Sequence, residues 1–324
     1  MKLVIQIPCY NEAKTLPDTL RDLPTTLPGI DEIEILVIDD GSTDETVAVA
    51  KEHGVHRVIS FPYNQGLAKA FARGLQEAAH MDADILVNTD ADNQYPGKYI
   101  QDLIVPIVTG NADMVVGCRA MHRIQHFSPT KKRLQRLGSK MVMWLTGAAI
   151  PDVTSGFRAY SARAVREIKV FSDFTYTVET IIQAARSGLQ LQAVEIDINP
   201  PTRPSRLFHS NFYYIRRQAT TILRIWAMYS PGKLFNDSGL ASLATGSLLL
   251  ARFVFYYFIS YPEPSGKVQS LIVASILMSL GFSLLLFGVV TDLIGVNRHL
   301  MEDTLNRLDN LERKLDQNDD GESE

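Results

Sequence analysis

Two kinds of segment alternate over about the first 200 residues of the chain. Short runs of apolar residues predict strands, and segments with apolar residues three and four apart predict amphipathic helices between them. The predicted strands are Leu3–Ile7, Ile33–Ile38, Val55–Ser60, Ile85–Thr89 and Ala112–Gly117, and the predicted helices are Ala13–Leu23, Thr43–His53 and Gly66–His80. This order is typical of a mostly parallel sheet with flanking helices, which places the fold in the α/β class.

The helix predicted after the second strand has recognisable end signals. Ser42 or Thr43 is a suitable N-cap, and Asp44 and Glu45 suit the positive end of the helix dipole. Gly54 suits the end of the helix. These polar residues therefore have a structural explanation that competes with any chemical one.

The pattern changes after residue 205. Aromatic residues interleave with arginines over 207–230, as expected of amphipathic helices at a membrane surface. Two long apolar stretches follow, over 240–261 with Arg252 as the one charge and over 268–291 with no charge. Each is long enough to cross the roughly 30 Å hydrocarbon core of a bilayer.

Only "PEPSGK" lies between the two stretches, so they predict an antiparallel hairpin with both chain ends on one side of the membrane. Basic residues at those ends outnumber Lys267 in the connection, which predicts that this side is cytoplasmic. They are Arg216, Arg217, Arg224, Lys233 and Arg298. We therefore expect a multi-pass protein of the inner (plasma) membrane. The alternative is a buried hairpin of a soluble domain. Arg252 favours this alternative slightly, although its side chain could also snorkel or pair within a membrane helix bundle.

Leucine spacing in the tail predicts one more helix. Met301, Leu305, Leu308, Leu311 and Leu315 recur three and four residues apart before an acidic end. This helix and the transmembrane helices offer a route to a homo-oligomer. The expected organisation is a cytoplasmic catalytic domain over 1–205, amphipathic interfacial helices over 206–234, two transmembrane helices over 235–295 and a cytoplasmic tail over 296–324.

Composition narrows the class of protein further. The 324 residues are 46% hydrophobic, enough for a large core, and the formal net charge of −4 argues against nucleic acid as a partner. Cys9 and Cys118 are the only cysteines, so neither a disulfide framework nor a zinc site is expected. Pro8, Asn11 and Glu12 interrupt the apolar N-terminus, which we interpret as a first strand and not as a signal peptide.

Polar groups gather where the predicted strands end. The stretches "IPCYNE", "DDGSTD", "DADNQYP" and "GCR" follow the first, second, fourth and fifth strands. Ligands of open parallel sheets bind outside the carboxyl ends of the strands, so we expect these loops to line one crevice. The sequence has no glycine-rich dinucleotide fingerprint after the first strand and no G-x-x-x-x-G-K-[ST] motif, which argues against nicotinamide and P-loop enzymes.

Asp90 and Asp92 form an acid-x-acid pair in the third of these stretches. Their hard oxygens suit Mg²⁺ or Mn²⁺, ions that use one or two carboxylates together with substrate phosphates. Such a cation would neutralise the charge of a diphosphate leaving group. An isolated pair of this kind is more often a set of turn or cap residues, so its meaning depends on the other loops.

Taken in order, "IPCYNE", "VIDDGSTDET", "NQGLAKAFARG", "DADNQYP", "GCR", "TSGFRAY" and the C-terminal hairpin resemble the inverting family 2 glycosyltransferases of the GT-A fold. Within them the chain is most similar to the polyprenyl-phosphate sugar synthases, such as dolichyl-phosphate mannosyltransferase and its bacterial undecaprenyl-phosphate relatives. The resemblance covers about residues 3–295. It implies transfer of one sugar, with inversion, from a UDP- or GDP-linked donor to undecaprenyl or dolichyl phosphate at the cytoplasmic face.

The resemblance also implies roles for individual residues. Asp90 would face the donor, while Asp92 and Gln94 would hold Mg²⁺ or Mn²⁺ with the diphosphate. The residues implied in nucleotide or donor binding are Pro8, Tyr10, Glu12, Asp39, Asp40, Lys69, Asp90, Ala91 and Arg203. Asp39 has a structural alternative as a cap for the loop that follows it.

The acceptor is an anion, and guanidinium groups grip phosphate bidentately. Arg119 and the cluster "KKRLQR" supply such groups; the family pattern expects an arginine and a nearby serine here, and Arg133 or Arg136 with Ser139 fits it. We interpret the two lysines of the cluster as a solvated or membrane-facing surface. The residues implied in acceptor binding are Arg119, Arg133, Arg136, Ser139, Ser155 and Arg206.

Asp152 matches a family carboxylate that has been considered as a base. An alkyl phosphate is already ionised at neutral pH, so we interpret Asp152 as a residue that orders the catalytic site. The chain departs from the family in "PPTRPSRLF", where the family has a loop ending in Gly-x-Ser-Lys. Prolines replace the glycine beside Arg203 and Arg206, which puts the flexibility of this loop in question.

Three other functions fit parts of the sequence. A processive polysaccharide synthase would need more membrane spans and a Q-x-x-R-W motif, which "QATTILRIW" does not supply. A sugar-1-phosphate nucleotidyltransferase would need a glycine-rich N-terminal loop with an arginine. A catalytically silent membrane scaffold would have no need of Asp90, Asp92, Gln94 and Arg119 together.

Overall fold

The computed structural model describes residues 1–120, 138–140, 142–144, 146–170, 176–200, 231–259 and 268–321. Contacts divide the chain into two compact units, Met1–Asn211 and Phe212–Glu324. The predicted boundary at 205/206 and the predicted interfacial helices up to 230 lie outside the described residues, so they stay predictions.

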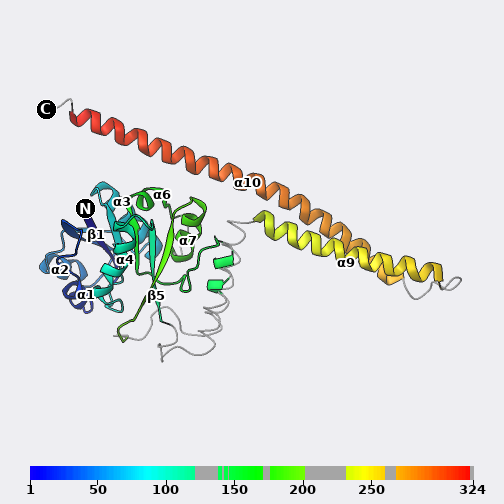
Figure 1. The fold of residues 1–324 in the computed structure, drawn as a ribbon, viewed down its shortest axis with the longest axis horizontal. Coiled ribbons are helices and arrows are strands. Elements are labelled where there is room, and N and C mark those ends of the chain that lie inside the picture. The colour runs from blue at the N-terminus through cyan, green and yellow to red at the C-terminus, as the bar shows by residue number, and fades with distance from the viewer. Residues whose placement is uncertain are drawn as a thin grey trace. The chain divides into compact units, whose positions relative to one another are not determined.

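The first unit is built on a seven-stranded sheet with the order β3-β2-β1-β4-β6-β5-β7 (Figure 1). All neighbouring strands pair parallel except β6, which is antiparallel to both β4 and β5. The strands are β1 (Lys2–Cys9), β2 (Glu32–Asp39), β3 (Arg57–Ser60), β4 (Ile85–Asn88), β5 (Met114–Arg119), β6 (Arg158–Ser161) and β7 (Leu191–Ile196). The prediction of a mostly parallel α/β sheet is therefore confirmed.

Helices cover both faces of this sheet. They are α1 (Leu16–Asp22), α2 (Thr46–Glu52), α3 (Leu67–His80), the short 3₁₀ helix η1 (Gly97–Tyr99), α4 (Ile100–Val108), α6 (Ala162–Glu167) and α7 (Thr177–Arg186). Each predicted strand and helix of the first 120 residues is present, within about three residues of its expected ends. The connections from β1 to β2 and from β2 to β3 pass through helices because parallel neighbours need a crossover.

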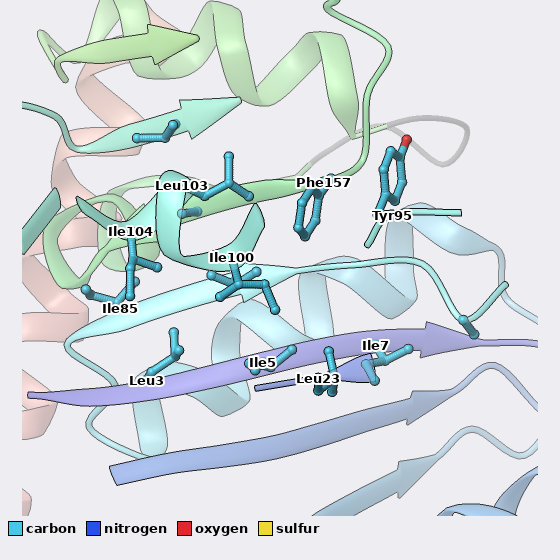
Figure 2. Close-up of a cluster of buried hydrophobic side chains, with 14 of the residues drawn as sticks. Leu3, Ile5, Ile7, Leu23, Ile85, Tyr95, Ile100, Leu103, Ile104 and Phe157 are labelled. Carbon is cyan, nitrogen blue, oxygen red and sulfur yellow. The ribbon is translucent and has the colours of Figure 1, made fainter. Parts of the chain in front are cut away.

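Alternate residues of the central strands form the core on the face covered by α1 and α4. Leu3, Ile5 and Ile7 of β1 are completely buried. Figure 2 shows them below Ile100 and Ile104 of α4, within one continuous apolar cluster. β1 is buried on both faces from Leu3 to Cys9, and its alternate residues face this cluster because successive side chains of a strand point to opposite faces.

One local prediction is wrong. Neither Ser42 nor Thr43 caps α2, which begins at Thr46 with Glu45 in the N-cap position and no side-chain cap. The Ser42 hydroxyl instead accepts the backbone N–H of Asn11 at 2.8 Å, so it serves the loop after β1. Gly54 does follow the helix as expected, with φ of +73°.

The second unit contains two long helices, α9 (Pro231–Ile259) and α10 (Val268–Gly321). They pack antiparallel, as Figure 1 shows for α9 and the first half of α10. Segments of 25 and 30 residues, Leu234–Phe258 and Val268–Asn297, are long and apolar enough to cross a membrane. Only 11% and 17% of their apolar windows is buried, which is unlike a core hairpin of a soluble domain.

Small residues line the contact between the two helices. Gly232, Gly239 and Gly246 recur every seven residues on α9, and Gly281 and Gly288 do so on α10. A Cβ atom on Gly281 would lie 2.8 Å from the carbonyl oxygen of Gly239 and 2.8 Å from Leu243 Cγ. The glycines therefore let the two backbones approach closely, as in membrane helix pairs.

The predicted tail helix exists but is not a separate element. α10 runs without interruption through the expected boundary at 295/296 to Gly321. No side-chain contact of the tail leucines is described, so the predicted oligomer through them stays a prediction. Arg252, the charge within the first apolar stretch, is exposed on α9, as a snorkelling side chain would be.

Candidate functional site

The sheet brings the predicted motifs to one edge. Cys9 at the end of β1 is paired with Asp39 at the end of β2, and β4 lies on the other side of β1. β5 ends at Arg119 on the same edge. β6 runs the opposite way, so its first residue, Arg158, also lies there, and the loop before it carries Asp152. Chain segments from all parts of the first unit therefore meet outside the carboxyl ends of the parallel strands.

The loops after β1 and β2 are joined by side chain to backbone hydrogen bonds. Asn11, in the left-handed region with φ of +55°, accepts the backbone N–H of Thr43 through Oδ1 at 2.8 Å. The hydroxyl of Thr46 accepts the N–H of Glu12 at 2.9 Å. Together with the Ser42 contact, these bonds make a rigid rim beside Asp39.

Asp39 and Asp40 are both almost fully buried. Asp39 Oδ1 accepts the N–H of Ser42 at 3.0 Å, so its predicted structural alternative as a loop cap is confirmed. Asp40 accepts the N–H groups of Gln65 and Gly66 at 2.7 and 2.9 Å, which fixes the loop before α3. Burial raises the pKa of Asp40, and these two hydrogen bonds oppose that rise.

Besides the aspartates, five residues implied in nucleotide binding lie within the described part of the chain. Pro8 is in β1, Glu12 is buried, and Tyr10 is 41% exposed, which leaves its ring available to a ligand. Lys69 is exposed in the first turn of α3. Ala91 is buried between the two acids of the acid-x-acid pair.

Asp92 and Gln94 form a compact turn after β4. Asp92 Oδ1 accepts the backbone N–H of Gln94 at 3.2 Å, and Asp92 Oδ2 accepts its side-chain amide at 2.7 Å. Asn93 between them has φ of +54°, a left-handed conformation that asparagine tolerates well. The turn therefore holds two oxygen-bearing side chains next to each other.

Asp90 lies against the loop before β6. A Cβ atom on Gly156 would be 3.2 Å from Asp90 Oδ1, so only glycine lets this loop approach the carboxylate. Burial and the neighbouring Asp92 raise the pKa of Asp90 to about 7, with Arg119 acting in the opposite direction. A cation between the two carboxylates would relieve their repulsion.

The donor set at this turn fits a hard divalent cation. Asp92, Gln94 and Asp90 offer oxygen atoms, and Mg²⁺ or Mn²⁺ needs few protein ligands where a diphosphate supplies the others. Among the residues that the structure describes, no group of three or more His, Cys, Asp or Glu side chains is placed to hold a metal ion. The few oxygen atoms at this turn suit a cation whose other ligands come from a diphosphate.

Arg119 and Asp152 form a bidentate ion pair. Arg119 Nε donates to Asp152 Oδ2 at 2.7 Å and Nη2 donates to Oδ1 at 3.1 Å, while Nη2 also donates to the hydroxyl of Thr154 at 2.9 Å. The Asp152 side chain is 1% exposed and that of Arg119 is 15% exposed. Burial alone would raise the pKa of Asp152, but the charge and hydrogen bonds of Arg119 outweigh it and hold the pKa below its ordinary value.

A buried polar network, which the sequence analysis missed, lies under these groups. Asn88 of β4 donates to the carbonyl oxygen of Gly156 at 2.8 Å and to the hydroxyl of Tyr176 at 3.1 Å, and it accepts from Gln6 at 3.0 Å. Arg158 donates to the carbonyl oxygens of Ser155 at 2.7 Å and Val153 at 2.9 Å. Polar residues within apolar strands were the signal that could have pointed to this network.

The remaining predicted acceptor residues divide into two groups. Ser155 and Ser139 are 0% and 1% exposed, so in this structure their hydroxyls do not face solvent. Arg133, Arg136, Arg203 and Arg206 lie outside the described residues, and their predicted contacts with phosphate stay predictions.

Comparisons with known proteins agree on one family for this chain. Residues 4–169, just over half of the chain, match the family model for glycosyl transferase family 2. Glycosyltransferase AglJ of Haloferax volcanii is 28% identical over 319 residues, which cover 95% of this chain and 97% of that protein. Undecaprenyl-phosphate mannosyltransferase of Micrococcus luteus is 29% identical over 207 residues, 60% of this chain and 83% of that protein. Further relatives are named as transferases that act with dolichyl or undecaprenyl phosphate.

A solved structure supports the fold. The crystal structure of glucosyl-3-phosphoglycerate synthase from Mycobacterium tuberculosis, in complex with Mn²⁺, UDP and glucosyl-3-phosphoglycerate, superposes with a TM-score of 0.52. The match covers 70% of this chain and 78% of that chain, at 19% sequence identity. Similarity at this level concerns the arrangement of strands and helices and not the substrate.

Proposed function

The chain belongs to glycosyl transferase family 2 and has the GT-A fold, and from this premise we propose that it transfers one sugar from a nucleoside-diphosphate sugar to a polyprenyl phosphate. The similarity to polyprenyl-phosphate sugar transferases supports this acceptor class. The observation that carries the proposal is the meeting of the Asp92–Gln94 turn and the Arg119–Asp152 pair beside Asp90 at one sheet edge.

The donor half of the site is formed by the first two loops and the acidic turn. Asp39, Tyr10 and Glu12 would bind the base and ribose, since they line the rim made by the loops after β1 and β2. Asp92 and Gln94 would hold a divalent cation, which would stabilise the negative charge of the departing nucleoside diphosphate. Asp90 is close enough to both halves to orient the sugar.

The acceptor half centres on Arg119. Its bidentate bond to Asp152 fixes the guanidinium plane beside Asp90, where its positive charge would attract the lipid phosphate. Asp152 is a poor base here because its pKa is held low by Arg119. The phosphate oxygen is already ionised and would attack the anomeric carbon directly, so a single displacement inverts the configuration at that carbon.

The hairpin would place this chemistry at a membrane surface. We propose that α9 and α10 cross the inner membrane and leave the first unit on the cytoplasmic face, where nucleotide sugars are made. A lipid phosphate in the cytoplasmic leaflet would then be on the same side of the membrane as the site.

The metal-binding role of Asp92 can be tested by substitution. In a radiolabelled sugar transfer assay with polyprenyl phosphate in detergent, Asp92→Ala should lower the rate by at least about 100-fold, the order of effect expected when one preorganised electrostatic contact is lost. Asp102→Ala, which changes an exposed acid on α4, is the matched control and should keep wild-type activity. Equal rates for Asp92→Ala and wild type would refute the proposal.

The same assay separates the rival functions. Mass spectrometry of the lipid product should show one sugar per lipid, and the coupling constant of its anomeric proton in the NMR spectrum should show an inverted linkage. Chains of several sugars would favour a processive synthase instead. If wild type forms no product with either UDP- or GDP-linked sugars, the non-catalytic scaffold becomes the better explanation.

A further inference from the structure

The turn that carries Asp92 and Gln94 is braced by a residue far away in the sequence. The side-chain amide of Asn199 donates to the carbonyl oxygen of Asn93 at 2.8 Å. The backbone N–H of Asn199 donates to the carbonyl oxygen of Gln94 at 2.9 Å. One residue therefore holds two successive carbonyl groups of this turn, across a separation of 106 positions.

These are the hydrogen bonds that reach the peptide groups of Asn93 and Gln94 from outside the turn, within the part of the chain that the structure describes. Within the turn, the side chain of Asp92 accepts from the backbone N–H and the side-chain amide of Gln94. Because Asn93 is in the left-handed region, the turn is a local reversal whose direction depends on outside support.

Asn199 is itself held in place by the core. It follows the edge strand β7, and the side chains of Ile196 and Ile198 beside it are packed in the main apolar cluster. The next part of the acidic loop is held independently, since Tyr95 stacks on Phe157 with ring centroids 5.1 Å apart and the N–H of Gly97 donates to Asp22 at 2.6 Å. The contribution of Asn199 is thus confined to the two residues at the cation-binding turn.

We propose that Asn199 is a positioning residue for the cation site, which sets the separation and direction of the Asp92 and Gln94 side chains. This inference rests on the proposed function, because it assumes that these side chains hold a divalent cation. Residues that orient metal ligands without touching the metal typically contribute 10- to 100-fold to metal affinity.

Mn²⁺ binding measures this role directly, without any turnover. Purified full-length protein in detergent is titrated with Mn²⁺, alone and with UDP or GDP, and free Mn²⁺ is followed by electron paramagnetic resonance. Asn199→Asp removes the amide donor, places a carboxylate oxygen against the carbonyl of Asn93 and keeps the side-chain size. It should weaken Mn²⁺ binding by about 10-fold or more.

The chain offers a closely matched control. Gln192, at the other end of β7, also donates its side-chain amide to a backbone carbonyl, that of Asn111 at 3.1 Å, and is similarly half-buried. Gln192→Glu, the same change from amide to carboxylate, should leave Mn²⁺ affinity unchanged, while nucleotide binding without metal should be equal in all variants. Thermal unfolding shows whether each variant is folded. If Asn199→Asp does not fold, Asn199→Ala serves as the second variant.

The outcomes separate this inference from the proposed function. Unchanged Mn²⁺ affinity in folded Asn199→Asp, or failure of both Asn199 variants to fold, overturns the positioning role while wild type still binds the cation. If wild type itself binds no Mn²⁺ with UDP or GDP, the metal-dependent part of the proposed function fails, and the positioning role fails with it.

Discussion

At the scale of single residues, the site is organised by pairs that satisfy each other. Asp152 is almost completely buried, and its charge is tolerated because Arg119 offers two parallel N–H donors. Gly41 is required for a different reason. Its φ is +70°, and a side chain there would clash with the backbone of Tyr63. Chemistry and local folding therefore use the same residues, and a substitution tests both.

The Arg119–Asp152 pair predicts a dependence of stability on pH. The pKa of Asp152 is depressed in the folded protein, so its contribution is present above the ordinary aspartate pKa of about 4 and is lost as the pH falls through the lower folded value. At pH 7 Asp152→Asn should unfold about 3 kcal/mol more easily than wild type, because Arg119 loses its charged partner. The difference should shrink toward pH 3.

Urea unfolding measures this difference. The buried rings of Tyr95, Tyr160 and Tyr176 lie in the first unit, so near-ultraviolet circular dichroism reports the packing of this unit. Unfolding is compared at pH 7, 5 and 3 in detergent. A difference of equal size at pH 3 and pH 7 would show that the ion pair is not its source.

At the scale of elements, the shapes of neighbouring loops and helices fit one another. The antiparallel β6 allows the loop carrying Asp152 and Gly156 to enter the site between the exits of β4 and β5. In the second unit, the glycines of α9 and α10 remove the side chains that would keep two helices apart. Close backbone approach replaces the hydrophobic effect, which is weak between helices in lipid.

Because the two helices approach closely, a large side chain at a glycine of their contact should destabilise the hairpin, whereas one outside the contact should not. Gly281→Leu should destabilise the second unit by roughly 1–3 kcal/mol, since overpacking of a close contact forces the helices apart. Gly295→Leu is the matched control on the same helix, because a Cβ atom there would meet nothing within 4 Å. The thermal unfolding midpoint of purified protein in detergent should fall for Gly281→Leu alone, and equal midpoints would contradict the observed packing.

At the scale of the whole molecule, length limits what the second unit can do. The 54 residues of α10 extend about 80 Å at 1.5 Å per residue, far more than the roughly 30 Å of a bilayer core. A helix that crosses once must therefore leave the membrane, and the charged residues from Arg298 onward are suited to water. The connection between α9 and α10 would then lie on the opposite side from both chain ends.

Cysteine labelling in intact cells tests this orientation. Ser265→Cys in the connection should react with a membrane-impermeant maleimide, whereas Asp320→Cys near the C-terminus should react only after permeabilisation. The native Cys9 and Cys118 are 2% and 3% exposed and should contribute little signal. The reverse pattern would overturn the cytoplasmic placement of the catalytic unit.

Much of the fold was predictable because its signals are local. Buried strands such as Ile85–Asn88 are runs of apolar residues, and amphipathic helices have apolar residues three and four positions apart. Both patterns can be recognised without knowing which elements pack against them. Two strands, β6 and β7, were not predicted. β6 is only four residues long and begins with a buried arginine, which gives no strand pattern. β7 is an edge strand in which only Ile196 is fully buried, so its apolar pattern is weak. The prediction that Ser42 caps a helix was wrong because it considered only neighbouring residues, whereas the hydrogen-bond partner of Ser42 is Asn11 in another loop.

Local sequence patterns were enough to establish the class of the fold, the two apolar helices and the acidic turn, because each depends on residues that are neighbours along the chain. The folded chain was needed to show that Asp152 holds Arg119, that Gly156 lies against Asp90 and that Asn199 braces the turn of Asp92. These contacts join residues 33, 66 and more than 100 positions apart. They depend on the strand order, because the sheet alone brings the ends of distant strands to one edge.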